Sequence, residues 1–272
     1  MSTVSLPAGG TPASAASRRG PALLRHSVAL AHRSLIKTFR TPEALIDVTI
    51  QPAIFLVLFT YVFGGAIAAG SQHDYLQYLL PGILAQTIAL AGATIGVNLN
   101  DDIASGVFDR FRSLPISRAA PLVGKVLADL VRYVLLFTVT LGFGYVLGFR
   151  VQTGVLDVLA AGALVMGFAL CLSWVSVWIG MMVRTPDAVQ GITMLVLFPL
   201  TFASSTFVKA DTLPGWLQTV VDLNPLTHLV DSLRALLLGG PRGDDLLWTL
   251  LSMAALLVVF VPLALRAYAR RA

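Results

Sequence analysis

Long apolar stretches without any Asp, Glu, Lys or Arg alternate with short charged connectors. They cover residues 48–73, 75–100, 133–149, 158–183, 188–208 and 246–265. A helix that crosses a membrane needs roughly 20 mainly apolar residues, with about 17 to 25 tolerated. A chain in lipid must satisfy its backbone N–H and C=O groups internally, and these runs are too long and uniformly apolar for barrel strands. The pattern therefore predicts six membrane-spanning helices.

We accordingly expect an all-α membrane protein with one transmembrane domain over residues 46–266. The expected spans are about 48–69, 76–99, 123–149, 156–183, 188–208 and 246–265. The composition agrees, because 12% of the residues are charged, against about 25% in soluble proteins. No stretch outside the spans is long enough for a separate soluble enzyme domain.

The 19 Lys and Arg residues predict the orientation. If the N-terminus is cytoplasmic, only Arg150, Lys209, Arg234 and Arg242 fall on the outer side. Cytoplasmic loops carry an excess of Lys and Arg, so both termini are expected in the cytoplasm. The net charge is +5, and the positively charged residues lie beside the spans. This distribution argues against a compact nucleic-acid-binding face.

The segment before the first span divides into two parts. Residues 1–20 are rich in Ser, Ala, Gly and Pro, and they lack the apolar core of a signal peptide, so we expect a disordered cytoplasmic tail. Residues 21–41 place apolar side chains such as Leu24 and Leu35 on one helical stripe and basic ones off it. This pattern predicts an amphipathic helix on the inner membrane surface; the alternative is a soluble helix packed on a partner.

The connector between the second and third spans, residues 101–121, is the most charged segment between spans. A short helix is expected over 107–114, before Pro115. It would carry Val107, Phe108, Asp109, Arg110, Phe111, Arg112 and Leu114. The apolar side chains share one face, which forms an aromatic knob with a charged rim. Such a knob suits docking into a groove on a partner; the alternative is a helix that rests at the lipid interface.

The connector between the last two spans, residues 209–244, is too long for a plain turn. Leu213 to Trp216 open one short helix, and Asn224-Pro225 breaks it. A second helix then runs to Gly239-Gly240. Neither is long enough to span, so we expect a pair of helices tucked part-way into the outer leaflet. His228 is interpreted as a surface polar residue, because no second His or Cys stands at metal-ligand spacing.

Several of these segments resemble type-2 ATP-binding-cassette (ABC) exporter permeases. The resemblance rests on Gln51-Pro52 followed by FLVLFTYVFGG, on Leu80-Pro81-Gly82, and on the stretch from Leu223 to Arg234. The connector from Ser105 to Lys125, with FDRFRSLPISR, is similar to the daunorubicin-resistance branch of that family. The four pieces occur in the expected order from about residue 25 onward.

The resemblance implies that the transport path and the ATPase lie on separate subunits. The helix over 107–114 would be a coupling helix that docks on a separate ATPase subunit, present in two copies, and the segment over 21–41 would be the connecting helix. Two permease chains, expected to be a homodimer, would face each other, with cargo moving chiefly along their second and fifth spans. ATP and Mg would be bound by the partner, because Gly124-Lys125-Val126 lacks the features of a P-loop. No cofactor or metal is expected on this chain.

The second and fifth spans supply the candidate translocation path: Gln86, Thr87, Asn98, Thr193, Thr201, Ser204 and Ser205. None is ionisable, which favours a hydrophobic or amphipathic cargo over an inorganic ion. The alternative is that these residues are ordinary packing devices of membrane helices. Separately, Lys125, Asp129 and Arg132 share one helix face. They predict a structural charge cluster at the inner interface, with a proton relay as the alternative.

The function expected from these features is that of the permease subunit of an ATP-driven exporter. The subunit would be non-catalytic and would lie in the bacterial plasma membrane, where it moves a drug, an antibiotic or a lipid-like compound outward. Two alternatives remain. One is a type-2 permease for polysaccharides or lipid-linked glycans, and the other is an ATP-independent carrier or scaffold.

Overall fold

The computed structural model describes residues 42–67, 72–105, 120–241 and 243–271, and every regular element in this part of the chain is helical. The elements are α2 (Pro42–Ile67), α3 (Gln72–Ala104), α5 (Ala120–Leu147), α6 (Val155–Met182), α7 (Pro186–Phe202), the 3₁₀ turn η1 (Ala210–Thr212), α8 (Gly215–Asp222), α9 (Pro225–Leu238) and α10 (Asp245–Arg271). The expected all-α class is confirmed. The tail over 1–20, the helix over 21–41 and the coupling helix over 107–114 lie outside the described residues.

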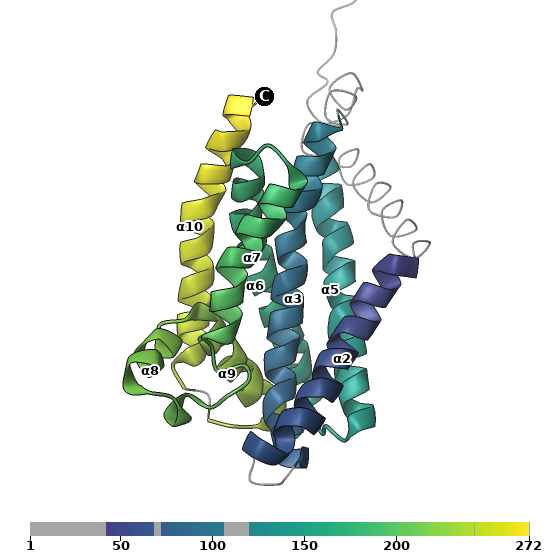
Figure 1. Cartoon of the computed structure of the whole chain (residues 1–272), viewed down its shortest axis with the longest axis vertical. Coiled ribbons are helices and arrows are strands. Elements are labelled where there is room, and N and C mark those ends of the chain that lie inside the picture. The colour runs from purple at the N-terminus through teal and green to yellow at the C-terminus, as the bar shows by residue number, and fades with distance from the viewer. Residues whose placement is uncertain (1–41, 68–71, 106–119, 242, 272) are drawn as a thin grey trace, which may run out of the picture.

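Four described helices are long and apolar enough to cross a membrane: α3, α6, the Asp129–Leu147 part of α5, and the Asp245–Ala267 part of α10. Two apolar helices are shorter, Ile50–Val62 within α2 and Pro186–Phe202, which is α7. All six fall on the apolar runs of the sequence. The bundle has two distinct ends, with α8 and α9 at one and the C-terminus at the other (Figure 1).

Helix α3 forms the centre of the bundle (Figure 1). Its apolar window is 78% buried, whereas that of α10 is 6% buried. It packs against α2, α5, α6, α7 and α9, while α10 lies on α6 and α9. The outward face of α10 carries large apolar side chains such as Val258 and Leu265, as expected of a helix in contact with lipid.

The α3–α6 contact is close because small residues line it. A Cβ at Gly92 would lie 2.8 Å from the Ala169 carbonyl oxygen, and one at Gly180 would lie 2.6 Å from the Gly96 carbonyl oxygen. Asn100 then donates to the carbonyls of Gly180 at 2.7 Å and Val183 at 2.8 Å. These bonds satisfy carbonyls at the end of α6 that have no partner within the helix. Small residues of α3 therefore allow close approach to α6.

Helix α7 ends at Phe202, before the end at residue 208 that the apolar run suggested. Pro199 consequently lies near the end of the helix and not at mid-span. The reason is a competing donor: the Asn224 side chain amide donates to the carbonyls of Leu200 at 2.7 Å and Ala203 at 2.6 Å. These carbonyls would otherwise bond to the N–H groups of a further turn. A residue distant in sequence thus ends the helix.

The expected pair of short helices is present as α8 and α9. Asn224 is the N-cap of α9, where its side chain accepts from the Leu226 N–H at 2.9 Å, and Pro225 follows in the first turn. Gly239 ends the helix with φ 75°, a left-handed conformation that glycine adopts without a steric penalty.

Candidate functional site

A dense cluster of polar side chains lies where α7 ends. We call it the polar junction. It comprises residues 203–208 together with Tyr75, Tyr78, Asn224, Thr227, Asp231 and Arg234. The segment 203–208 runs between α3 on one side and α9 on the other, and its residues Ser204, Ser205, Thr206 and Phe207 are buried.

Helix α3 holds the segment through two tyrosines and a glycine. The Tyr75 hydroxyl donates to the Phe207 carbonyl at 3.2 Å, and the Tyr78 hydroxyl donates to the Ser205 carbonyl at 2.7 Å. One turn further along α3, a Cβ at Gly82 would lie 2.7 Å from the Thr206 carbonyl oxygen. Glycine at position 82 therefore permits the backbone of the segment to lie against the helix.

Helix α9 holds the segment from the other side. Besides the two carbonyls bound by Asn224, the Thr227 hydroxyl accepts from the Ser205 N–H at 3.3 Å. Within the segment, the Ser204 hydroxyl donates to the Thr201 carbonyl at 2.6 Å, and its oxygen lies 2.8 Å from the Thr206 hydroxyl oxygen, within hydrogen-bond distance. Side chains thus replace the hydrogen bonds that a regular helix would supply.

Arg234 connects all three parts of the junction. Its guanidinium donates to the Asp231 carboxylate at 2.6 Å and to the Ser205 carbonyl and hydroxyl at 2.6 and 3.1 Å. Its Nε donates to the Tyr78 carbonyl at 3.2 Å, and its Cζ lies 3.6 Å from the centroid of the Tyr78 ring. The side chain is only 14% exposed, so an isolated charge there would be costly. The carboxylate and the ring both compensate that charge.

Aromatic rings join α2 and α7 to the same segment. The Phe207 ring stacks on Phe59 of α2 with centroids 4.5 Å apart, and on Phe202 of α7 with centroids 5.2 Å apart. The end of α7 is therefore in contact with α2, α3 and α9, which come from distant parts of the sequence.

The structure separates the predicted path residues into different environments. Ser204 and Ser205 belong to the polar junction. Thr201 donates to the Leu197 carbonyl at 2.9 Å within α7. Gln86 is buried in α3, Thr87 is half-buried there, and Asn98 is exposed. Contact of these residues with cargo stays a prediction.

Thr193 lies elsewhere on α7. It lines a small cavity with Ala93 of α3 and with Leu172 and Ser176 of α6. Its buried hydroxyl has no hydrogen-bond partner in the structure. Thr193 is thus a predicted path residue that faces a cavity between α3, α6 and α7.

Two residues of the predicted charge cluster can be placed in the structure. Asp129 and Arg132 are half-buried on α5, and Arg132 donates to the Thr94 hydroxyl of α3 at 3.2 Å. The side chain of Lys125 lies outside the described part, so the three-residue cluster stays a prediction. Arg132 has a role that its spacing did not indicate, since it links α5 to α3.

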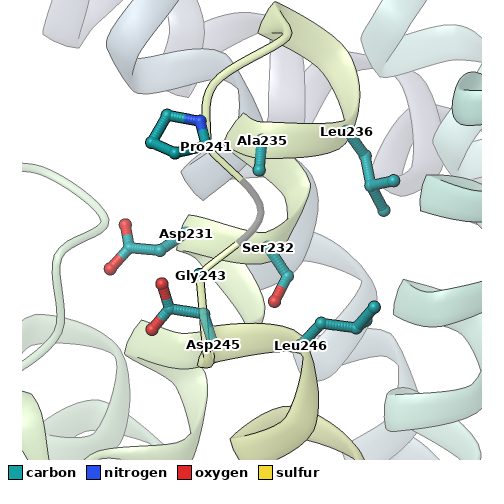
Figure 2. A pocket seen from close by; sticks show the side chains of 8 residues that line it. All are labelled: Asp231, Ser232, Ala235, Leu236, Pro241, Gly243, Asp245 and Leu246. Atoms are coloured by element: carbon teal, nitrogen blue, oxygen red, sulfur yellow. The ribbon is translucent and has the colours of Figure 1, made fainter.

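A second small cavity lies between α9 and the start of α10 (Figure 2). Asp231 and Asp245 stand at its edge, and Leu236 and Leu246 line it on the other side (Figure 2). Both carboxylates accept hydrogen bonds, Asp231 from Arg234 and Asp245 from His228 Nδ1 at 2.9 Å. His228 also stacks on Trp248, so it links α9 to α10. No group of three possible metal ligands occurs among the described residues.

Sequence reasoning singled out Arg234 and Ser205 for different reasons and missed the tyrosines that join them. Tyr75 and Tyr78 are three residues apart on α3, a spacing that places them on one face. Their hydroxyls also need partners when buried. The spacing and the need for hydrogen-bond partners indicate a polar contact on this face of α3. They do not identify the segment that makes the contact.

Replacing Asn224 with alanine is expected to destabilise the protein by about 2–4 kcal/mol, because α9 loses its N-cap and two α7 carbonyls lose their donor. A fall in the thermal unfolding midpoint of the detergent-solubilised protein measures the effect. Asn98→Ala, on the exposed face of α3, is the matched control and should leave the midpoint nearly unchanged. Equal midpoints for both variants would contradict the role assigned to Asn224.

Comparison with known proteins identifies the family. The model of the ABC-2 type transporter family matches residues 26–238. The chain is 41% identical to the daunorubicin resistance ABC transporter permease protein DrrB1 of Streptomyces coeruleorubidus, over 89% of this chain and 86% of the relative. It is 26% identical to the probable doxorubicin resistance ABC transporter permease protein DrrC of Mycobacterium tuberculosis, over 86% and 85%. It is also 26% identical to the putative transport permease ycf38 of Cyanophora paradoxa, over 76% and 72%.

The family match extends over the helices from α2 to α9 and over the polar junction, and it confirms the resemblance that the sequence motifs indicated. The matched proteins are permeases, the membrane components of transporters whose ATPase is a partner. This chain therefore belongs to the ABC-2 type transporter family, as a multi-pass membrane permease component.

Proposed function

We propose that this permease exports daunorubicin- and doxorubicin-like drugs, or other hydrophobic or amphipathic compounds, across a bacterial plasma membrane. The observation that carries the proposal is the 41% identity to a daunorubicin resistance permease over 89% of the chain. The polar but non-ionisable side chains of the candidate path are consistent with such a cargo.

The proposed topology has six spans, formed by α2, α3, α5, α6, α7 and α10, with both termini in the cytoplasm. The distribution of Lys and Arg supports it, because Arg150, Lys209 and Arg234 belong to the connectors opposite the C-terminal end. The end that carries α8 and α9 would then face outward (Figure 1).

In this topology the polar junction would lie at membrane depth, and the length of α7 supports that proposal. Its 17 residues extend roughly 26 Å at about 1.5 Å per residue, less than a hydrocarbon core of about 30 Å. Irregular backbone at that depth is tolerated where protein buries it or where it lines a water-filled cavity. The bonds from α3 and α9 meet that requirement for 203–208.

The energy for export would come from a partner ATPase, which binds ATP and Mg and is present in two copies. The helix over 107–114 would dock on it, and the segment over 21–41 would lie on the inner membrane surface. A second copy of the permease would complete the path, lined by Gln86, Thr87, Asn98, Thr193, Thr201, Ser204 and Ser205. The cluster of Lys125, Asp129 and Arg132 would stay at the inner interface as a structural element.

Drug accumulation in cells tests this function. A bacterial host without its own drug exporter should retain several-fold less doxorubicin when it makes both the permease and its ATPase. The permease alone, or with an ATPase that lacks its Walker lysine, should leave accumulation unchanged. Equal accumulation in all strains, with both proteins present in the membrane, would contradict the proposal. Glycan export would then be tested in its place.

A further inference from the structure

Many hydrogen bonds hold the polar junction together, in addition to the aromatic stacking of Phe207, although the surrounding bundle is apolar. Arg234 is its central donor and contacts Asp231 of its own helix, Ser205 of the segment and Tyr78 of α3. Apolar side chains could cover a static helix end without the cost of desolvating a charge. A network centred on a guanidinium has a different property: its strength depends on whether water can enter.

In a dry junction, each lost hydrogen bond leaves a buried donor or acceptor without a partner, which is unfavourable. Once water enters, the same carbonyls and N–H groups exchange protein partners for water at little net cost. The network therefore favours two discrete states, a closed dry one and an open wet one. A change between the dry and the wet state would affect α7 most directly. Segment 203–208 follows directly after that helix, and Phe207 stacks on its Phe202.

We infer that Arg234 is a positioning residue that latches the end of α7 to α3, and that this latch opens in each transport cycle. The inference rests on the proposed function and on the outward placement of α8 and α9. In the closed state the guanidinium joins Ser205 to Tyr78 and excludes water from the junction. When the partner's ATP cycle moves α7, water replaces these bonds and the outer end of the path opens.

Thiol labelling tests the latch with a reporter inside the junction. Ser204 is 3% exposed, the described hydrogen bonds of Arg234 go to other residues, and serine and cysteine are close in size. In a Cys171→Ser background, Ser204→Cys therefore supplies a single thiol. A membrane-impermeant methanethiosulfonate reagent is applied to the outside of cells that also make the ATPase. Labelling should be slow without turnover and faster while ATP is hydrolysed.

The Arg234→Lys variant keeps the charge but cannot form the forked contacts. It should raise the labelling rate roughly ten- to hundredfold even without ATP hydrolysis, because hydrogen bonds to a charged group are lost. His228→Gln, which removes the stacking of His228 on Trp248 of α10 and changes no residue of the junction, is the matched control and should leave the rate unchanged. Should Arg234→Lys fail to fold, Tyr78→Phe removes one hydroxyl donor and should give a smaller increase.

Native Cys171 distinguishes a local latch from general loosening, since it is the only cysteine of the chain and is buried in α6. In the protein that retains Cys171 and lacks the reporter, Arg234→Lys should not increase its labelling. The inference is overturned if Cys171 becomes equally reactive, if Arg234→Lys leaves the reporter protected, or if ATP hydrolysis does not change the reporter. If the reporter responds as expected but no drug is exported, the drug assignment fails while the latch stands.

Discussion

Replacing Gly96 with alanine is expected to remove most of the correctly folded protein from the membrane. The added Cβ would overlap the carbonyl group of Ser176 on α6, and backbone atoms cannot move aside as a flexible side chain can. The contact also carries hydrogen bonds, from the Gly96 N–H to the Ser176 hydroxyl at 3.1 Å and from that hydroxyl to the Ala93 carbonyl. Separating α3 from α6 would also weaken the bonds of Asn100. We expect a loss of roughly 3 kcal/mol or more.

The measurement is the fraction of solubilised protein that elutes as a single species, together with its thermal unfolding midpoint. Gly142→Ala on α5 is the matched control, because a Cβ there would meet nothing within 4 Å. That variant should be neutral or slightly stabilised, since alanine favours a helix over glycine. A Gly96→Ala protein as stable as the Gly142→Ala protein would show that the two helices are not packed so closely.

Replacing both Phe108 and Phe111 with aspartate is expected to abolish ATP-dependent drug export while leaving insertion in the membrane intact. The sequence places both rings on the apolar face of the helix proposed to dock on the ATPase. Two carboxylates on that face would have to be desolvated on docking, with no designed partner. The ATPase should no longer co-purify with the tagged permease from mild detergent.

Ser113→Asp is the matched control, since it adds a negative charge to the opposite face of the same helix. It should retain co-purification and most of the export. If the double aspartate variant still binds the ATPase and still exports drug, the docking role of residues 107–114 is wrong. If the double variant fails to reach the membrane, it reports on insertion and not on docking. The single variant Phe111→Asp is then used for the co-purification and export measurements.

Several motifs that carried the family resemblance are near one another in the structure. Gly82, from Leu80-Pro81-Gly82, lies against Thr206. Asn224, from Asn224-Pro225, binds the carbonyls at the end of α7, and Arg234 binds Ser205. Segments more than a hundred residues apart thus meet at the polar junction. This common location explains the motifs physically, because together they hold the non-helical segment 203–208 that follows α7.

The sequence predicts the helices of this protein well because apolar runs and charged connectors are local features. It also predicts α9 closely, since Asn224, Pro225 and Gly239 are capping signals next to the helix they bound. It could not place the end of α7, which depends on Asn224, a residue more than 20 positions away. Small residues at Gly92 and Gly96 predict a close neighbour for their helix, but nothing in their spacing identifies α6 as that neighbour.

The same limit applies to the candidate site. Hydroxyl residues over 201–206 indicate either a path or packing, and their periodicity does not distinguish the two. In the structure, Ser204 and Ser205 make hydrogen bonds within the polar junction, whereas Thr193 faces a cavity. Arg234 was visible in the sequence as a charge in a connector. Its contacts with Tyr78, across 156 positions of the chain, become visible only after folding.

Drug transport by the purified complex would show directly whether this permease exports doxorubicin. The permease and its ATPase are reconstituted into liposomes with the ATPase domains outside, and doxorubicin uptake is followed after addition of ATP and Mg. We predict uptake that requires both proteins and stops with an ATPase that lacks its Walker lysine. ATP hydrolysis by a well-assembled complex without any doxorubicin movement would contradict the account.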